Sequence, residues 1–356
     1  MYKKKVIVFL GSRAEIGIIK PAINSLKKKF DVFLLINSRN SKNNFFLTED
    51  IKIEKKNIFF LNLKIKDTKQ DDIFDYLSKF IKSSKKYLKQ NTYYFGVVLG
   101  DRYETLLFSY LCSFKKIPLV HFHGGESTFG SLDENYRHAI TKLSSLHFVS
   151  TEKYRDKVIA LGENPKKVID IGSLSLFTIQ KYKFQKLHNI LGKTIKNTII
   201  KRYFLVTFHP ETYSKLTFRE QIQPLLRVIS HNNNYNFIFT SSNLDEGGNI
   251  ITNQVKKFVK RKINCFFVSN LGHKNYLNLM KYSLGVLGNS SSGIIESPFM
   301  KTKCLNIGNR QEGRLISNQT ISVKNNFINI KKGMNKLIKL KTKKISLVYY
   351  KKNGLK

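Results

Sequence analysis

Residues 121–142 read HFHGGESTFGSLDENYRHAITK and join the end of an apolar strand to a helix. The segment holds two histidines, a diglycine, three carboxylates and then an Arg-His pair. In open α/β sheets, ligands bind just outside the carboxyl ends of the strands, at junctions of this kind. The segment therefore predicts an α/β fold with a ligand site at this strand end.

Short apolar runs alternate with longer amphipathic segments on both sides of that junction. In the first half the runs KKVIVFLG, DVFLLIN, YYFGVVLG, IPLVHFH, LHFVS and KVIDIG predict strands. Helical patterns lie between several of them, at 16–29, 71–88, 103–114, 134–144 and 152–161. Near-continuous hydrophobic strands linked by helices are typical of a parallel sheet that is covered on both faces.

The pattern restarts after a stretch rich in lysine and asparagine, with RYFLVTFHP, YNFIFTSS, NCFFVSN, LGVLGN and KCLNIG. Helices are expected around 218–230, 249–261, 274–282 and 292–298. We therefore predict an α/β, GT-B-like architecture, in which two doubly wound Rossmann-like domains face a central cleft. The expected parts are an N-terminal domain (1–180), a linker with room for a helix (181–201), a C-terminal domain (202–340) and a basic tail (341–356).

The net charge is +39, with 63 lysines and arginines against 24 acidic residues. The lysines are spread over the chain without an arginine-rich or aromatic-basic motif, so we interpret the charge as a solvated surface and predict no nucleic-acid partner. Lysine and asparagine are abundant and tryptophan is absent, as in A/T-rich genomes. Five of the eleven arginines fall in polar junctions, where lysine cannot reproduce a bidentate hold on phosphate or carboxylate. These are Arg13, Arg102, Arg137, Arg310 and Arg314.

The three cysteines stand singly inside apolar runs. This spacing argues against a disulfide framework or a zinc site, and it favours a reducing, cytoplasmic compartment. The chain shows no signal-peptide pattern, and its apolar runs are shorter than the ~18 residues of a membrane span. We therefore expect no membrane association.

Two polar junctions follow predicted strands of the first domain. GSRAEIG can offer backbone N–H groups and Arg13 to a phosphate at a helix N-terminus, although a structural turn explains it equally well. LGDRYE places Asp101 and Arg102 at a strand end, where Asp101 is suited to a ligand hydroxyl or a proton. Capping of the next helix is the competing interpretation of Asp101.

The opening segment adds Glu126, Asp133 and Glu134 within a short reach. Neighbouring carboxylates push their pKa values apart, so that one can donate a proton while another accepts it. Asp133 could instead cap the helix that begins at Glu134. The diglycine permits close approach of the backbone.

Two further junctions follow strands of the second domain. TFHPET puts His209 at a strand end, where a structural role is the alternative. GNSSSGIIE forms a hydroxyl-rich loop (289–293) that opens a helix and suits a diphosphate, with Glu296 placed to take both hydroxyls of a ribose. NIGNRQEGR would close this site with Arg310 and Arg314, whereas the serines alone could form a capped turn.

These segments resemble the hydrolysing UDP-N-acetylglucosamine 2-epimerases, and most closely the bacterial branch that makes N-acetylmannosamine for sialic acid. The segments GSRAEIG, LGDRYE, HFHGGE, DENYRHAITK, STEKYRDKVIALGENPKKVIDIGSLS, YFLVTFHPET, GNSSSGIIE and NIGNRQEGR follow the order of that branch, over about residues 4–315. GNSSSGIIE with NRQEGR is specific, and GSRAE is much less so.

The resemblance implies a GT-B fold, a homodimer, no metal and no nicotinamide cofactor, with UDP bound mainly by the second domain. It implies a nucleotide site made of Arg13, Arg102, Ser290, Ser291, Glu296 and Arg310. It implies a catalytic set of Asp101, Asp133 and His209, helped by Glu126 and Glu134. The remaining candidates for contacts with the sugar substrate are Arg137, His138, Gln311 and Arg314.

The chain departs from the family at two places. Many relatives carry a glutamate, considered catalytic, two residues after the first histidine of HFHGGE, where this chain has His123. Proton transfer therefore rests on His123 or moves to Glu126, and the sequence leaves both open. The family's usual final helix, which crosses back to the first domain, is expected to be absent, with a looser interdomain hinge.

The expected reaction converts UDP-N-acetylglucosamine and water to UDP and N-acetylmannosamine through a 2-acetamidoglucal. Three alternatives remain open. They are an epimerase of a 2,4-diacetamido-trideoxy nucleotide-sugar of the legionaminic type, a GT-B glycosyltransferase that needs an acceptor, and a nucleic-acid-binding protein that exploits the +39 charge.

Overall fold

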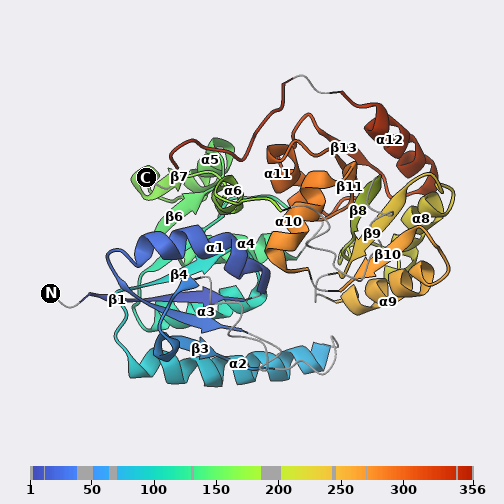
Figure 1. The fold of residues 1–356 in the computed structure, drawn as a ribbon. Helices are drawn as coiled ribbons and strands as arrows, with labels where there is room; N and C mark the ends of the chain where they lie inside the picture. Colours follow the sequence, from blue (N-terminus) through green and yellow to red (C-terminus); the bar gives the residue numbers. More distant parts are fainter. Residues whose placement is uncertain are drawn as a thin grey trace. The chain divides into compact units, whose positions relative to one another are not determined.

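The computed structural model describes residues 3–11, 13–37, 51–63, 70–129, 132–185, 202–242, 246–269, 271–341 and 344–354. The chain forms two compact units, each with its own sheet and core (Figure 1). The first unit comprises Met1–Glu126, Asp133–Gln180 and Tyr349–Lys356. The second comprises Ser127–Leu132 and Lys181–Val348.

The first unit is built on a seven-stranded parallel sheet in the order β3-β2-β1-β4-β5-β6-β7. Its strands are β1 (Lys5–Leu10), β2 (Asp31–Ile36), β3 (Ile58–Phe60), β4 (Phe95–Leu99), β5 (Leu119–Phe122), β6 (Leu146–Val149) and β7 (Val168–Asp170). The chain winds outward in one direction from β1 and in the other from β4. This reversal makes a topological switch point between β1 and β4, where doubly wound sheets bind ligands.

Helices cover both faces of this sheet: α1 (Arg13–Leu26), α2 (Gln70–Gln90), α3 (Tyr103–Phe114), α4 (Asp133–Lys142), α5 (Glu152–Ala160) and α6 (Leu174–Gln180), with short 3-10 turns η4 (Lys55–Asn57) and η5 (Pro165–Lys167). Strand β1 shows why. Val6 and Val8 join a core with α1 and α6, whereas Ile7 and Phe9 join a core with α2, α3 and α4. Successive residues of a strand point to opposite faces, so a strand buried on both sides is apolar throughout.

The second unit has a six-stranded parallel sheet in the order β10-β9-β8-β11-β12-β13. Its strands are β8 (Tyr203–Thr207), β9 (Asn236–Thr240), β10 (Cys265–Val268), β11 (Gly285–Gly288), β12 (Cys304–Ile307) and β13 (Thr320–Val323). Its helices are α8 (Phe218–Ser230), α9 (Gly248–Val259), α10 (Gly272–Tyr282), α11 (Ser291–Phe299) and α12 (Phe327–Lys339). The order reverses between β8 and β11, which gives this unit its own switch point.

The core of the second unit also lies on both sides of its sheet. Helices α8, α9 and α12 pack on one face against residues such as Phe204, Phe237 and Leu305. On the other face, Gly293 of α11 lies against Val286 and Cys304. Both sheets are therefore doubly wound, as the alternating apolar runs predict.

The end of the chain differs from the expected basic tail. Tyr349 is 3 % exposed and belongs to the first unit, where its carbonyl accepts from Ser173 N–H (2.8 Å) and its hydroxyl lies 3.0 Å from that of Tyr154. Lys351 pairs with Asp170 at 2.8 Å. Two tyrosines and a main-chain bond hold this segment in place, although lysines dominate its composition.

Four elements are absent from the sequence-based expectations: β3, β13, α6 and α12. Strands β3 and β13 lie at sheet edges, where short and partly exposed runs carry little apolar signal. The change of unit falls at Lys181. The helix expected in the 181–201 linker falls mainly on 186–201, outside the described residues. No helix in the described ranges is long and apolar enough to cross a membrane.

Candidate active site

Two loops at the switch point of the first unit carry predicted residues. After β1, Gly11 N–H donates to Oε2 of Glu15, in the first turn of α1, at 2.8 Å. Arg13 is the first residue of α1, and its side chain lies outside the described part of the structure. In the loop after β4, Arg102 donates from Nε to Glu104 Oε2 at 3.1 Å. The Arg102 guanidinium is therefore aimed by a neighbouring carboxylate.

Glu104 is a site residue that the sequence analysis missed. It is fully buried at the start of α3, and its carboxylate accepts from Tyr76 Oη (3.3 Å) and from Asn37 Nδ2 (3.4 Å). These partners come from α2 and from the loop after β2. Glu104 thus links Arg102 to α2 and to the loop after β2. It stands inside LGDRYE, so its place after a strand end was the available signal.

A buried arginine gathers the predicted carboxylates of the first unit. Arg137 of α4 is 1 % exposed, and its guanidinium donates to the Asp101 carboxylate, to Glu134 Oε2 (2.5 Å) and to the backbone oxygen of Glu126 (2.5 Å). One side chain therefore joins the loop after β4, the segment after β5 and helix α4. We expected Arg137 to contact substrate, and the structure shows it holding protein carboxylates.

Helix α4 begins at Asp133, and Asp133 is half-buried in its first turn. Glu134 Oε1 also lies 3.3 Å from His138 Nε2, so His138 joins the same group of side chains. The helix after β4 has Arg102 at its N-cap, and Asp101 precedes that position. Asp101 is therefore engaged with Arg137 rather than capping α3.

His121 fixes the loop that carries Asp101. Its ring is fully buried, and its Nε2 lies 2.8 Å from the carbonyl oxygen of Gly100. Burial lowers the pKa of His121 to about 3, so the ring is neutral and its Nε2–H donates to Gly100. Gly100 has a φ of +78°, a conformation that glycine adopts without strain.

The diglycine of HFHGGE is explained by packing. Gly125 has a φ of +75°, and a Cβ at this position would lie 2.5 Å from the carbonyl oxygen of Tyr154 in α5. Only glycine fits there. The close approach that the sequence predicted is made to the protein's own helix.

In the second unit, Asn289 organises the switch point between β8 and β11. Its side-chain amide accepts from His209 N–H (2.7 Å) and donates to His209 O (2.9 Å). The backbone carbonyl oxygen of Asn289 accepts from Arg310 Nη1 (3.1 Å) and from Gln311 Nε2 (2.9 Å). The structure therefore brings His209, Arg310 and Gln311 together. Gln311 was expected to contact substrate, but it is buried and supports the loop.

His209 is held as a neutral ring. Its Nδ1 lies 3.4 Å from Ser242 Oγ, at the end of the neighbouring strand β9. Burial and the positive charge of Arg310 lower the pKa of His209 well below its usual value. A neutral imidazole beside an arginine can accept a hydrogen bond at pH 7.

Glu211 is a second residue that the sequence analysis missed, within TFHPET. Its Oε1 accepts from the backbone N–H groups of Asn309 (3.0 Å) and Arg310 (3.3 Å). Its own backbone exchanges two hydrogen bonds with the side-chain amide of Gln221 in α8. Burial raises the pKa of Glu211. Glu211 thus anchors the loop that carries Arg310.

The serines of GNSSSGIIE open helix α11. Ser290 occupies the N-cap of α11 without a side-chain capping bond, and its Oγ lies 3.0 Å from Ser292 Oγ. Ser292 in turn lies 2.6 Å from the hydroxyl of Tyr276 in α10. Ser291 is the first residue of α11. The loop is therefore a cluster of hydroxyls at a helix N-terminus, a place suited to an anion.

Glu296 lies on the buried side of α11, 6 % exposed. Its Oε1 is 3.7 Å from Nε2 of His273, the second residue of α10. Neither His273 nor Tyr276 lay in a segment that the sequence analysis singled out. Arg314 is half-buried, and its backbone N–H donates to Gln311 O at 3.2 Å.

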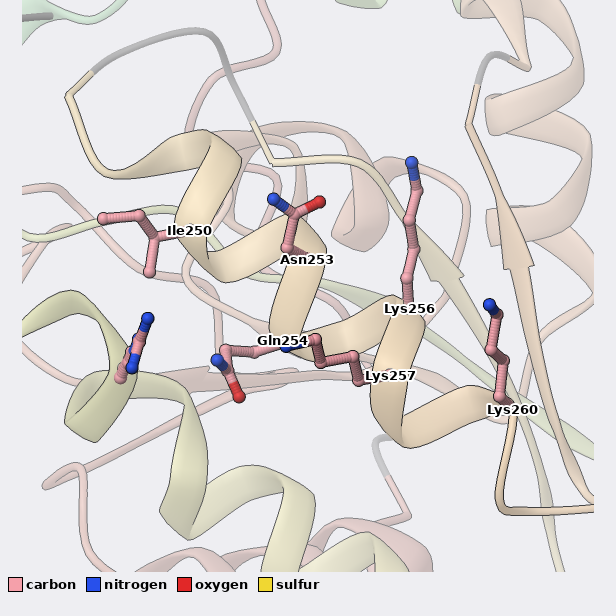
Figure 2. Close-up of a pocket in the computed structure, with 7 residues that line it drawn as sticks. Ile250, Asn253, Gln254, Lys256, Lys257 and Lys260 are labelled. Carbon is pink, nitrogen blue, oxygen red and sulfur yellow. The ribbon is translucent and has the colours of Figure 1, made fainter.

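The pocket in Figure 2 lies on helices α8 and α9 of the second unit and encloses about 370 Å³. None of the residues that line it was predicted for the site, and four of the seven are basic. The lining residues are Arg219, Ile250, Asn253, Gln254, Lys256, Lys257 and Lys260. The absence of a nucleic-acid partner stays a prediction.

Across the described ranges, no three His, Cys, Asp or Glu side chains are grouped so that they could hold a metal ion.

The sequence matches a known protein family over residues 26–354, and that family is described as UDP-N-acetylglucosamine 2-epimerase. The chain is 38% identical to the polysialic acid biosynthesis protein P7 of Escherichia coli, over 99% of this chain and 92% of that protein. It is 42% identical to a Campylobacter jejuni GDP/UDP-N,N'-diacetylbacillosamine 2-epimerase (hydrolyzing), over 62% of this chain and 57% of that protein.

Solved structures share the GT-B-like fold. The Methanocaldococcus jannaschii UDP-GlcNAc 2-epimerase, in complex with UDP-GlcNAc and UDP, has a TM-score of 0.80 at 18% identity, covering 98% of this chain and 97% of that one. The Neisseria meningitidis enzyme bound to UDP-GlcNAc has a TM-score of 0.78 at 17% identity, covering 94% and 91%. At this identity the likeness establishes the fold.

Proposed function

Because this chain belongs to the UDP-N-acetylglucosamine 2-epimerase family, we propose that it converts UDP-N-acetylglucosamine and water to UDP and N-acetylmannosamine. The family match covers residues 26–354 and includes the proposed site residues apart from Arg13. The chemistry of those residues supports the same reaction.

The reaction has a difficulty that the residues must solve. H2 of the sugar is not next to a carbonyl group, so a base alone cannot remove it. Departure of UDP from C1 has to run ahead and build positive charge on the ring, which carboxylates stabilise. Removal of H2 then gives 2-acetamidoglucal. Water adds at C1 while a proton returns to C2 from the opposite face, which inverts that carbon.

The first unit carries the acid–base groups in this proposal. Asp101, Glu126, Asp133 and Glu134 supply carboxylates, and Arg137 holds three of their segments in register. Carboxylates held close together in one site can divide the acid and base roles between them. One carboxylate can then take H2 while another delivers a proton. His138 contacts Glu134 and belongs to the same group.

The second unit carries the nucleotide in this proposal. Ser290 and Ser291 open α11 and are suited to the diphosphate, with Arg310 beside them. Glu296 is suited to the ribose hydroxyls. His209, neutral and close to Arg310, would face the leaving diphosphate. Arg13, Arg102 and Arg314 remain proposed contacts of the phosphates and the sugar.

The observation that carries the proposal is the gathering of Asp101, Glu134 and the Glu126 segment around one buried arginine in a member of this family. Incubation with UDP-N-acetylglucosamine in D₂O, followed by proton NMR, tests it. We expect free UDP and N-acetylmannosamine with deuterium at C2. Release of UDP with C2 unchanged would contradict the epimerase reaction.

A second sugar is supported by the names of two relatives. The Campylobacter jejuni relative is 42% identical over 220 residues and is named for a diacetylated trideoxy amino sugar. The same carboxylates could invert C2 of that sugar, because the difference lies at C4 and C6. A competition assay with both UDP-sugars separates the two: the preferred substrate is the one with the higher kcat/KM.

We also propose that the enzyme is a cytoplasmic homodimer that supplies an amino sugar for a surface glycan such as sialic acid. The whole-chain likeness to the Escherichia coli polysialic acid biosynthesis protein supports the pathway class. Three free, buried cysteines are compatible with a reducing compartment. Light scattering after size-exclusion chromatography tests the dimer, and a monomer at micromolar concentration would contradict it.

A further inference from the structure

His123 is the residue whose role the sequence leaves open, and its backbone is unusual. It follows β5 with a φ of +66° and is 9 % exposed. Its N–H donates to Phe148 O on the neighbouring strand β6 at 2.8 Å. A residue other than glycine rarely adopts this backbone conformation unless its surroundings fix it, and such residues cluster at functional sites.

Both ring nitrogens of His123 have hydrogen-bond partners within the first unit. Nε2 accepts the backbone N–H of Leu174, at the start of α6, at 3.2 Å. A backbone amide only donates, so Nε2 must present its lone pair. In a neutral imidazole the proton is then on Nδ1. Nδ1 lies 3.3 Å from Oε1 of Glu126, so His123 donates to that carboxylate.

Glu126 is held from several directions. It is 3 % exposed, and the same Oε1 accepts from Ser150 Oγ at 2.8 Å, just after β6. Its backbone oxygen accepts from Arg137. The same Arg137 binds the carboxylates of Asp101, from the loop after β4, and of Glu134, from α4. His121 nearby is neutral. Glu126 is thus a carboxylate whose orientation the protein fixes.

We propose that His123 is a positioning residue that orients the Glu126 carboxylate through Nδ1–H and takes no proton from the sugar itself. To act as a base at Nε2, the ring would have to give up the Leu174 N–H and leave a buried backbone donor unpaired. To act at Nδ1, it would have to release Glu126 and set two N–H groups against each other at Leu174. This inference rests on the proposed function, with Glu126 in the role left open by the sequence.

The tautomer can be measured on the protein without substrate. Long-range ¹H–¹⁵N correlation of the imidazole rings distinguishes an Nδ1–H ring from an Nε2–H ring, and loss of signals in His123→Asn assigns the residue. We expect His123 to be the Nδ1–H form. An Nε2–H form would overturn the inference. Because no turnover is needed, this result does not depend on the proposed substrate.

Two substitutions at His123 then separate positioning from proton transfer. Asparagine tolerates positive φ and keeps an N–H donor near the place of Nδ1, but an amide cannot act as a base. Glycine also tolerates this backbone and removes the donor. We expect kcat of His123→Asn to stay within about 10-fold of the wild type, and His123→Gly to lose about 10²-fold. Equal, large losses in both variants would make His123 the proton-transfer group.

Ser150→Ala provides a parallel test, because it removes the other hydrogen-bond donor to Oε1 of Glu126. A carboxylate that loses a donor to its charged form ionises less readily, so its pKa rises. We expect the acid limb of kcat/KM to move to higher pH in both Ser150→Ala and His123→Gly, with UDP affinity unchanged. An unchanged limb in both would overturn the inference. A wild type inactive on every UDP-sugar would instead contradict the proposed function.

Discussion

Both sheets reverse their strand order at a switch point, yet the polar side chains there are held in different ways. In the first unit, charged groups hold charged groups: Arg137 joins the carboxylates of Asp101 and Glu134, and Glu104 holds Arg102. In the second unit, main-chain amides and neutral side chains dominate, as in the bonds of Asn289 to His209 and of Glu211 to the Arg310 loop.

This difference fits two kinds of work. Proton transfer needs carboxylates that are held in fixed positions, and a buried arginine does this. An anionic nucleotide needs fixed N–H donors and hydroxyls, which a helix N-terminus and a loop provide. The comparison predicts that substitutions in the first unit change chemistry and stability, whereas those in the second change nucleotide affinity.

The largest expected effect is on the arginine that gathers the carboxylates. Arg137→Met leaves the half-buried carboxylates of Asp101 and Glu134 without their partner, so the free energy of unfolding should fall by about 3 kcal/mol, the lower end of the cost of an uncompensated buried charge. Urea denaturation followed by circular dichroism measures it. Lys56→Met, which removes an exposed pair with Glu54, is the control and should cause no measurable change. If Arg137→Met and Lys56→Met had the same free energy of unfolding, the ion pairs of Arg137 would not stabilise the first unit.

Asp101→Asn should lower kcat by about 10²-fold or more, the scale of a lost acid–base group. The amide keeps the size of the side chain, so UDP affinity should be that of the wild type. Steady-state kinetics and calorimetric UDP titration measure the two quantities. Asp156→Asn, on the exposed side of α5, serves as the control. Near-normal turnover in Asp101→Asn would remove this residue from the mechanism.

The anchor of the second unit offers the next test. Glu211→Ala leaves the N–H groups of Asn309 and Arg310 without their acceptor, at about 1 kcal/mol each, so the Kd for UDP should rise by roughly 10- to 30-fold. Glu211→Gln keeps a carbonyl oxygen as acceptor and should bind UDP much more tightly than Glu211→Ala. If the two variants bind UDP equally weakly, the negative charge matters and the contrast between the units weakens.

The smallest effect concerns pH. Because the pKa of His209 is lowered in the folded state, the unfolded chain takes up a proton near pH 6.5 while the folded protein does not. The stability tied to this ring is therefore present above pH 6.5 and is lost as pH falls below it. His209→Gln should lose about 1 kcal/mol less than the wild type between pH 6.5 and 5.5. Urea denaturation at the two pH values measures this loss for both proteins. If the wild type and His209→Gln lose the same free energy of unfolding, His209 is not buried as a neutral ring.

Much of the fold is predictable because double burial leaves a plain mark. Strand β1 reads KVIVFL and helix α8 matches its expected range of 218–230, since a covered strand must be apolar and a packed helix must be amphipathic. Strand β13 escaped notice because this edge strand is short and partly exposed. The segment that begins at Tyr349 was expected to be a basic tail, but Tyr349 is buried and its hydroxyl lies 3.0 Å from that of Tyr154.

The sequence by itself determined the doubly wound architecture, the family and the segments that carry polar residues, because periodicity and motif order are properties of the chain. Only the tertiary structure decided what those residues hold. Arg137 turned inward to the carboxylates, Gln311 supports the Asn289 loop, and His123 meets the amide of a residue 51 positions away. Hydrogen bonds between such distant segments depend on the direction of side chains in the folded sheet, and no local pattern records that direction.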